Sequence, residues 1–274
     1  MPGSGFGCRP GPTRLSGPRL KLASWNVNSI RARLENVAGW LAAVQPDVLC
    51  LQETKVVDDD FPREEFTRLG YSLATVGQPG YNGVAIASRL PLDNVCVDLP
   101  GADPTRERRL IAADIAGVRV INVYVPNGKG VNLPSFQDKL RWFERLRLLL
   151  DTQHTPEENV LVCGDFNVAR EARDVYDPAL LAGQLLFHPD ERRALERVID
   201  FGLVDVFRRF HERAGEYSWW DYRAGSVRMN RGLRIDYVLL SGPLAQRCQA
   251  AWIDREPRSA PKPSDHAPVL VELT

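Results

Sequence analysis

Short apolar runs alternate with longer amphipathic stretches from residue 20 to residue 274. The runs are rich in Val, Ile and Leu and predict strands over 20–26, 47–53, 82–88, 109–115, 118–125, 159–166, 235–241 and 268–273. Between the first two, apolar residues recur at helical spacing and predict an amphipathic helix over 30–44, which ends before Pro46. The same periodicity predicts helices over about 134–151 and 190–200.

The order of these elements predicts the fold class. Many strands with few helices between them do not fit a regular alternation of strand and helix. The runs 109–115 and 118–125 are joined through Gly117, which indicates an antiparallel hairpin. We therefore expect an α/β fold with two packed mixed or antiparallel sheets flanked by helices, in one domain over 19–274. A short echo, SWNV at 24–27 against DFNV at 165–168, hints at two similar halves.

Residues 1–18 are dense in Gly and Pro, which predicts a flexible tail without the apolar segment of a secretory signal. No apolar stretch approaches the roughly 20 residues that span a bilayer, so we expect no membrane association. The five cysteines form no CxxC pair, and Cys50 and Cys163 lie inside apolar runs. This usage predicts free thiols, a reducing compartment and a cytoplasmic protein.

The chain has 35 Lys and Arg residues against 35 Asp and Glu residues, so its formal charge is zero. This balance argues against a tail-driven DNA binder, which needs a large basic excess, but permits a nucleic-acid enzyme with locally separated charge. Residues 14–33 and 222–235 contain arginines and no acid, whereas 58–65 is acidic and is expected to face away from DNA. The stretch 217–236 interleaves aromatic residues with arginines, which suits stacking on bases or sugars and neutralising phosphates.

Polar side chains gather where the predicted strands end. They are Asn26, Asn28, Glu53, Tyr124, Asn127, Asp165, Asn167, Ser264, Asp265 and His266, with Asp236 at the start of another run. Each alone is most simply a turn or solvated residue. Convergence would gather three carboxylates, those of Glu53, Asp165 and Asp265, whose repulsion a divalent cation relieves. Such oxygen ligands suit Mg²⁺ or Mn²⁺ rather than zinc, and predict metal-assisted hydrolysis of a phosphate ester.

The motifs that carry these residues occur in a recognisable order. They are WNVN, LQETK, YNGVAIAS, INVYVPNG, GDFN, WWDYR, NRGLRIDY and PSDHAPV, from about residue 20 to 274. Together they resemble the exonuclease III family of apurinic/apyrimidinic (AP) endonucleases, and its bacterial exonuclease III members in particular. GDFN and SDH mark only the wider endonuclease/exonuclease/phosphatase superfamily. The phrases LQETK, NRGLRID and KPSDHAPV are more specific and indicate the DNA-repair branch.

The resemblance implies a four-layered, DNase I-like α/β sandwich. It implies a monomeric Mg²⁺-dependent enzyme, with Mn²⁺ as a substitute, that cleaves duplex DNA 5′ to abasic sites and leaves a 3′-hydroxyl. It also implies 3′→5′ exonuclease and 3′-phosphatase or phosphodiesterase activity at the 3′ ends of duplex DNA. Matching positions give the metal ligands as Asn26, Glu53 and Asp265, with Asp165, Asn167 and His266 at a second metal if one is bound.

The same matching implies catalytic roles. Asp165 orients or deprotonates the attacking water, and Asn167 donates to the scissile phosphate. His266 contacts a phosphate oxygen and is held protonated by its partner Asp236, as an adjacent anion favours. Tyr124 is a phenol near the phosphate that helps the leaving 3′ oxygen.

DNA-binding positions follow in the same way. The backbone-contact positions are Arg31, Tyr81, Asn127 and Lys129. Trp219, Leu233 and Ile235 line an apolar pocket for a flipped-out abasic sugar, which has no base edge to recognise. Trp220 is left open between a core role and a binding role. Position 28 is Asn where some relatives place Asp, which puts a ligand role there in doubt.

Two alternatives stay open. The first is another phosphoesterase of the superfamily, a DNase I-like nuclease or an inositol or lipid phosphatase; the aromatic and arginine-rich stretch 217–236 argues against it. The second is a non-catalytic DNA-binding protein on the same fold. Such a protein is expected to have lost Glu53, Asp165 or His266, and all are present.

Overall fold

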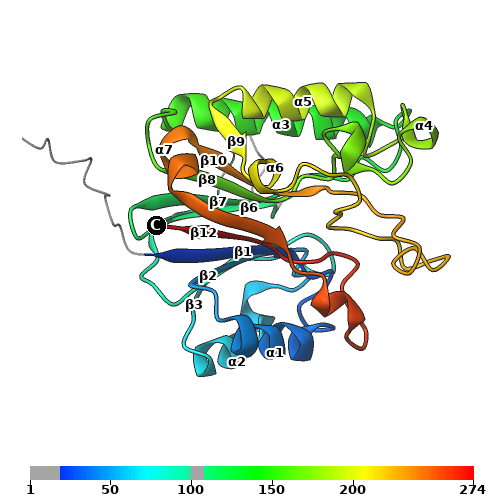
Figure 1. Ribbon diagram of the computed structural model, residues 1–274. Coiled ribbons are helices and arrows are strands. Elements are labelled where there is room, and N and C mark those ends of the chain that lie inside the picture. The colour runs from blue at the N-terminus through cyan, green and yellow to red at the C-terminus, as the bar shows by residue number, and fades with distance from the viewer. Residues whose placement is uncertain (1–18, 98, 100–107) are drawn as a thin grey trace, which may run out of the picture.

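The computed structural model describes residues 19–97, 99 and 108–274 (Figure 1). The predicted flexible tail over 1–18 lies outside the described residues and stays a prediction. Among the described residues, no helix combines the length and the apolar character needed to cross a bilayer.

Two six-stranded sheets form the centre of the molecule. The first has the order β11 (Cys248–Ile253), β12 (Val269–Leu273), β1 (Leu20–Asn26), β2 (Val48–Gln52), β4 (Val84–Ser88) and β3 (Ser72–Val76). The second has the order β5 (Asp93–Cys96), β6 (Leu110–Ile115), β7 (Val118–Tyr124), β8 (Val160–Asp165), β10 (Asp236–Ser241) and β9 (Leu203–Asp205). Each sheet has one parallel pair, β1 with β2 or β7 with β8, and antiparallel neighbours elsewhere. The predicted pair of mixed sheets and the hairpin β6–β7 are confirmed.

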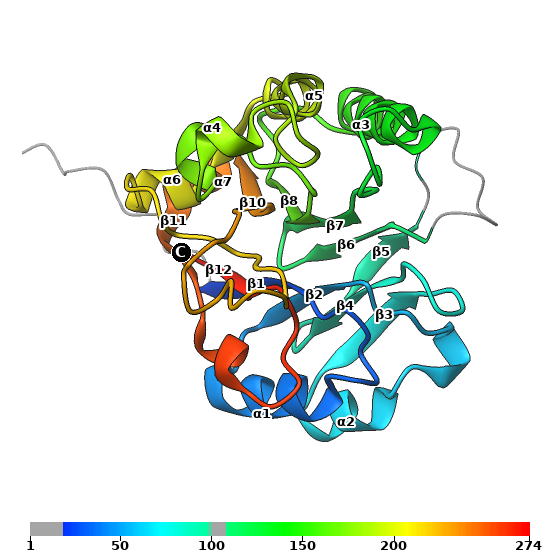
Figure 2. The ribbon, with the colours of Figure 1, turned by 90° about the vertical axis from the view of Figure 1, so that its right-hand side faces the viewer.

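Helices cover the outer face of each sheet and complete four layers (Figures 1 and 2). On the first sheet lie α1 (Leu34–Val44) and α2 (Arg63–Arg68), and on the second lie α3 (Pro134–Gln153) and α5 (Pro189–Ile199). The shorter helices are α4 (Pro178–Leu181), α6 (Phe207–Phe210) and α7 (Gly242–Arg247), with 3₁₀ turns at Asp58–Asp60, Ala172–Asp174 and Glu256–Ser259. Apolar clusters fill the space between the sheets and beneath both helix layers. Because helices or another sheet cover both faces, the central strands are near-continuous apolar runs.

The differences from the predicted elements have local causes. The helix predicted from residue 30 begins at Leu34, because the amides of Ser29 and Ile30 bond the carbonyls of Glu53 and Thr54 instead. The strands β3, β5, β9 and β11 are not among the predicted runs. All four are edge strands of the two sheets. Since β9 is short and β3 and β5 are largely exposed or half-buried, their apolar signal is weak.

A buried amide fixes how the sheets sit on each other. Asn122 on β7 donates from Nδ2 to the carbonyls of Leu51 and Ala85 on the opposite sheet, both at 2.9 Å. Its Oδ1 accepts from Gln52 Nε2 at 2.7 Å, and Gln52 also donates to Ser24 Oγ. This bridge lies next to the strand ends that carry the polar residues of the sequence.

Replacing Asn122 with Leu is therefore expected to lower the free energy of unfolding by about 2–4 kcal/mol, because it removes the three buried hydrogen bonds that join the sheets through this amide. Urea denaturation followed by circular dichroism measures this change. Exposed Asn132 provides the control, since Asn132→Leu removes an amide from the surface. Equal stability of the Asn122 variant and the wild type would contradict the inter-sheet role.

Candidate active site

The polar residues singled out in the sequence meet at one end of the two sheets. Asn26 ends β1 and Glu53 directly follows β2, while Tyr124 ends β7 and Asp165 ends β8. Asp236, the first residue of β10, pairs with Asp165 in the register of the second sheet. The parallel pair of each sheet thus delivers its carboxyl end to the same place, as expected where strand ends form a site.

The two halves use the same local turn. The backbone amide of Asn28 donates to Asn26 Oδ1 at 2.9 Å, and the amide of Asn167 donates to Asp165 Oδ1 at 2.8 Å. Both are Asx turns, which let a short polar side chain redirect the chain after a strand. Asn28, Glu53 and Asn167 all have positive φ, between 46° and 51°. Left-handed backbone at non-glycine residues is uncommon and is held by its surroundings.

Asn26 joins the two halves. Its buried Nδ2 donates to Glu53 Oε1 at 3.0 Å and to Asp165 Oδ2 at 2.9 Å. Glu53 Oε2 accepts from Lys55 Nζ at 2.8 Å. Burial opposes the charge of Glu53, but Lys55 and Asn26 outweigh it and lower the pKa of this carboxyl. Glu53 is therefore an anion at neutral pH.

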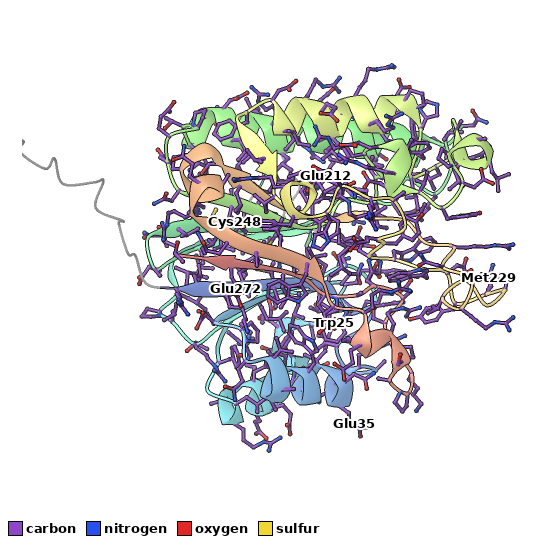
Figure 3. The ribbon with its side chains drawn as sticks, in the orientation of Figure 1. Trp25, Glu35, Glu212, Met229, Cys248 and Glu272 are labelled. Carbon is purple, nitrogen blue, oxygen red and sulfur yellow. The ribbon has the colours of Figure 1, made fainter. Side chains whose placement is uncertain are left out.

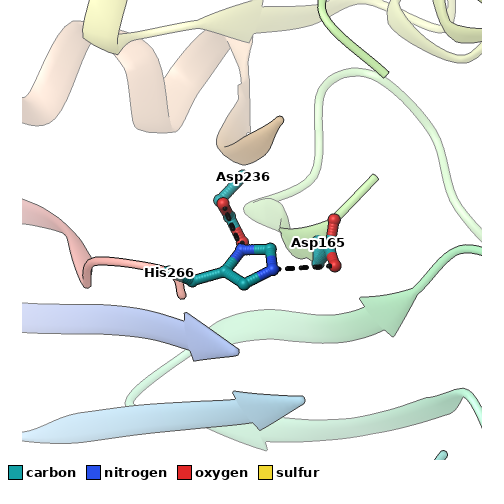
Figure 4. A group of neighbouring side chains, drawn as sticks. All are labelled: Asp165, Asp236 and His266. Atoms are coloured by element: carbon teal, nitrogen blue, oxygen red, sulfur yellow. Dashed lines mark hydrogen bonds and ion pairs between the residues drawn. The ribbon is translucent and has the colours of Figure 1, made fainter. Parts of the chain in front are cut away.

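His266 lies between two carboxylates (Figure 4). Its Nδ1 contacts Asp236 Oδ2 at 2.9 Å, and its Nε2 lies 3.7 Å from Asp165 Oδ2. Asp236 also accepts from Ser218 Oγ at 2.6 Å, so both of its oxygens are engaged. Burial disfavours the imidazolium, but Asp236 and Asp165 outweigh it and raise the pKa of His266 to about 10. The histidine therefore carries a proton that a phosphate oxygen can accept as a hydrogen bond.

The surroundings of Asp165 disfavour its charged form. Burial raises its pKa to about 7, His266 acts against this rise, and Asp236 and Glu53 add to it. Burial also raises the pKa of the neighbouring Tyr124 phenol, with Glu53 and Asp165 contributing, so this group stays protonated. A carboxylate whose pKa is near 7 is suited to accept a proton from water.

Asp265 is tied into the same cluster. Its Oδ2 accepts from Trp219 Nε1 and its Oδ1 from Asn28 Nδ2, both at 3.0 Å. Asn28 Oδ1 accepts in turn from Lys55 Nζ at 2.5 Å. Asp265 is therefore connected through Asn28 to the same lysine that pairs with Glu53. Burial opposes the charge of Asp265, but His266 and these donors lower its pKa.

These groups suit a divalent cation. Glu53 and Asp165 accept from the same Asn26 amide, and Asp265 is linked to Glu53 through Asn28 and Lys55; carboxylate and amide oxygens favour a hard ion. Asp165, Asp236 and His266 also present ligand atoms within 4.8 Å of one another. In this second group Asp236 is already bound to His266 and Ser218, and His266 Nε2 lies 3.7 Å from Asp165 Oδ2.

The residues expected to contact the DNA backbone surround the site. Tyr81, Asn127 and Lys129 line a depression of about 440 Å³ together with Tyr124. Asn127 Nδ2 also donates to Asn167 Oδ1 at 2.9 Å. On the other side, the basic stretch 222–235 includes a projecting loop with Met229 exposed (Figure 3).

The position of Arg31 differs from what the charge pattern predicts. The sequence predicts that the acidic run 58–65 lies away from the DNA-contact residues. Instead, Asp60 forms an ion pair of 2.7 Å with Arg31, and both side chains are more than half exposed. The acidic run is thus only partly separated from the expected binding surface, because the turn at Asp58–Asp60 brings Asp60 beside Arg31.

The expected sugar pocket is mostly closed by packing. Leu233 and Ile235 are buried with Ala169, Val175 and Phe187, and half-buried Trp219 packs against them. Trp219 bridges through its backbone to Leu233 and to His266, and its ring Nε1 donates to Asp265, so the ring lies next to the polar cluster.

The open question about Trp220 is answered by its surroundings. Trp220 is fully buried beside Tyr217 and Ala267 and donates to Asn230 Oδ1. It is a core residue, while the adjacent Trp219 contacts the site.

The sequence did not single out some residues that build the site. Ser218 donates to Asp236, and Lys55 neutralises Glu53. A serine follows no helical or strand spacing that would predict such a role. Lys55, in contrast, lies within the motif LQETK and could have been considered with Glu53. Lys139, discussed below, was visible as a lysine on an apolar helix face.

A two-sheet sandwich with carboxylate, amide and imidazole groups at its strand ends defines a class of phosphoesterase folds. The chain belongs to the Endonuclease/Exonuclease/phosphatase family, whose model matches residues 23–266. It is 35% identical over 266 residues to the exodeoxyribonuclease III of Haemophilus influenzae, with 93% of this chain and 100% of the relative covered.

Solved structures give the same result. An AP endonuclease from Archaeoglobus fulgidus has a TM-score of 0.89 at 44% identity, covering 92% of this chain and 98% of that chain. The 3′ phosphatase NExo from Neisseria, bound to a product DNA hairpin, also has a TM-score of 0.89, at 38% identity and with 93% and 99% covered. The expected four-layered fold and the family resemblance are therefore confirmed.

Proposed function

We propose that this protein is a DNA-repair phosphodiesterase that hydrolyses the DNA backbone 5′ to abasic sites and leaves a 3′-hydroxyl. The same site would act as a 3′→5′ exonuclease and remove 3′-phosphates and related blocks from duplex DNA. The observation that carries the proposal is the linkage of Asp165, Glu53 and Asn26 beside the His266–Asp236 pair. The names of the similar proteins, an exodeoxyribonuclease III, an AP endonuclease and a 3′ phosphatase on DNA, support the choice of substrate.

In this proposal each polar group has one task. Asp165, with its pKa raised to about 7, orients the attacking water and takes its proton. Protonated His266 donates a hydrogen bond to an oxygen of the scissile phosphate, where negative charge develops. Asn167 would donate to another oxygen by exchanging one of the Nδ2 bonds that it makes to the Val125 carbonyl and Asp165. Tyr124 keeps its phenolic proton available for the leaving 3′ oxygen.

Glu53, Asn26 and Asp265 are the residues that would hold Mg²⁺, and Mn²⁺ would substitute for it. The bound ion would supply charge to the phosphate oxygens and so favour attack by water. If a second ion is bound, Asp165, Asn167 and His266 are its proposed ligands; His266 would then be neutral and Asp165 would be a ligand instead of the base.

DNA recognition is assigned to two sets of residues. Arg31, Tyr81, Asn127 and Lys129 would contact the backbone, which fixes register without reading sequence. Trp219, with Leu233 and Ile235 behind it, would receive the baseless sugar. We further propose that the enzyme acts as a monomer in the cytoplasm, in one domain over 19–274.

A duplex with one tetrahydrofuran abasic mimic tests the proposal. We expect incision at the mimic in Mg²⁺, and loss of incision when EDTA removes the metal and its recovery when Mg²⁺ is added back. Gel analysis of the labelled strand identifies a 3′-hydroxyl product by its extension with a DNA polymerase. Parallel nicked and 3′-phosphorylated duplexes measure the other two activities.

A matched duplex without the mimic is the control. Equal internal cleavage of both duplexes would indicate an unspecific nuclease, and release of phosphate from inositol polyphosphates without DNA incision would indicate another phosphoesterase. Binding of the abasic duplex without cleavage in Mg²⁺ or Mn²⁺ would identify a non-catalytic binder.

A further inference from the structure

Lys139 has an unusual position for a lysine. It lies on α3 among Phe136, Phe143 and Leu146, on the face that packs against the second sheet, and its side chain is 0% exposed. A charged group in such a place loses its water, and it is tolerated only where other groups bind all of its hydrogens.

Lys139 Nζ meets that requirement with three acceptors. It donates to Glu191 Oε1 at 2.5 Å, to the carbonyl of Asn167 at 2.7 Å and to the carbonyl of Asn127 at 3.2 Å. An ammonium has three N–H groups, so each hydrogen has one partner. Two of the partners are main-chain atoms of residues assigned to the active site.

Glu191 is held as firmly as the lysine. It lies fully buried in the first turn of α5, where Oε2 accepts the amide of His188 at 3.0 Å. The pair therefore connects α3 and α5 to the loops that follow β7 and β8. The loop after β7 packs closely against the lysine: a Cβ added to Gly128 would lie only 3.3 Å from Lys139 Cδ.

The two residues that supply these main-chain carbonyls are also joined through their side chains. Asn127 Nδ2 donates to Asn167 Oδ1, and Asn167 Nδ2 donates to the Val125 carbonyl and to Asp165 Oδ2. Asn167 also has a φ of 51°, a conformation that its neighbours must maintain. Because a buried ion pair adds little to stability compared with apolar residues of the same size, stability alone is a weak reason for this lysine.

We propose that Lys139, paired with Glu191, is a positioning residue that sets the Asn127 and Asn167 main chain for phosphate binding. This inference rests on the role proposed for Asn167 in DNA cleavage. Lys139 touches no reacting atom itself and acts through the two carbonyls that it holds.

The test uses the full chain with the double change Lys139→Met and Glu191→Gln, which removes both charges together. Loss of the Nζ donors should let the two loops shift, and a displacement of about 1 Å costs up to roughly 10²-fold in rate. We therefore expect kcat for abasic incision to fall by about 10- to 100-fold, with a smaller change in KM. Glu196→Gln is the control: it breaks the α5 ion pair with Arg170, and its activity should match the wild type.

A double-mutant cycle separates positioning from general damage to the fold. If Lys139 acts through Asn167, the Lys139→Met/Glu191→Gln change should have little further effect on kcat in an Asn167→Ala background. Multiplication of the two effects would show that the pair acts elsewhere and would overturn the inference.

Amide hydrogen exchange gives a readout that does not depend on catalysis. We expect faster exchange at residues 127–129 and 166–168 in the double variant, with the strands β7 and β8 unchanged. Unchanged exchange in these loops would overturn the inference even if activity fell. Failure of the wild type to incise abasic DNA would reject the proposed function instead, and the exchange result would still test the positioning role.

Discussion

Replacing Asp165 with Asn is expected to lower kcat for abasic incision by at least about 10³-fold while DNA affinity stays close to that of the wild type. The new side chain keeps the size of the old one but cannot accept a proton from water. Its amide nitrogen would also face donors, because Asp165 Oδ2 accepts from the Nδ2 groups of both Asn26 and Asn167. The change therefore removes the base and disturbs the link between the two halves of the site.

Single-turnover incision and fluorescence anisotropy, the latter with a tetrahydrofuran duplex in Ca²⁺, separate the two effects. Asp200→Asn, an exposed change at the end of α5, is the control for the substitution itself. Incision at the wild-type rate by the Asp165 variant would show that another group activates the water. A parallel loss of affinity would show that Asp165 chiefly maintains the binding surface.

Replacing Asp236 with Asn is expected to lower kcat by about 10²-fold, since the carboxylate orients His266 and stabilises its charge. Burial works against the imidazolium, and Asp236 is the leading group that overcomes it. An amide would preserve the shape but supply no negative charge. The nitrogen-15 chemical shifts of the His266 ring, followed against pH, would show directly whether its proton is lost at lower pH than in the wild type.

The matched control for this change is Glu216→Gln. Glu216 contacts His211 Nδ1 at 3.1 Å, so it forms a similar pair far less buried than the one at His266. The control should leave kcat unchanged. An Asp236 variant with full activity and an unshifted histidine titration would mean that Asp165 alone maintains the charge of His266.

Sequence reasoning predicted well where these polar residues lie in the fold, because they follow strands that are strongly apolar. The ends of β1, β2, β7 and β8 were predicted within one or two residues, and each carries a polar side chain of the site. The echo between SWNV and DFNV corresponds to two Asx turns at equivalent places in the two sheets. The local pattern determined both the strand and the turn that follows it.

Features that depend on partners distant in sequence were harder to predict. The pairing of Arg31 with Asp60 depends on where a turn places its acids. The burial of Trp220 beside half-buried Trp219 depends on which face of an irregular segment meets Ala267. Neither contact follows a helical or strand period, so the pattern of apolar residues does not predict either of them.

The pairing of β1 with β12 has a consequence for a chain still under synthesis. Leu20 is opposite Leu273 in the first sheet, and His266 precedes β12. A ribosome-bound chain without this last segment has Glu53 and Asp165 but lacks both the imidazole and the strand beside β1. Such a chain should be unable to cut DNA until residues 266–273 are available to pair with β1.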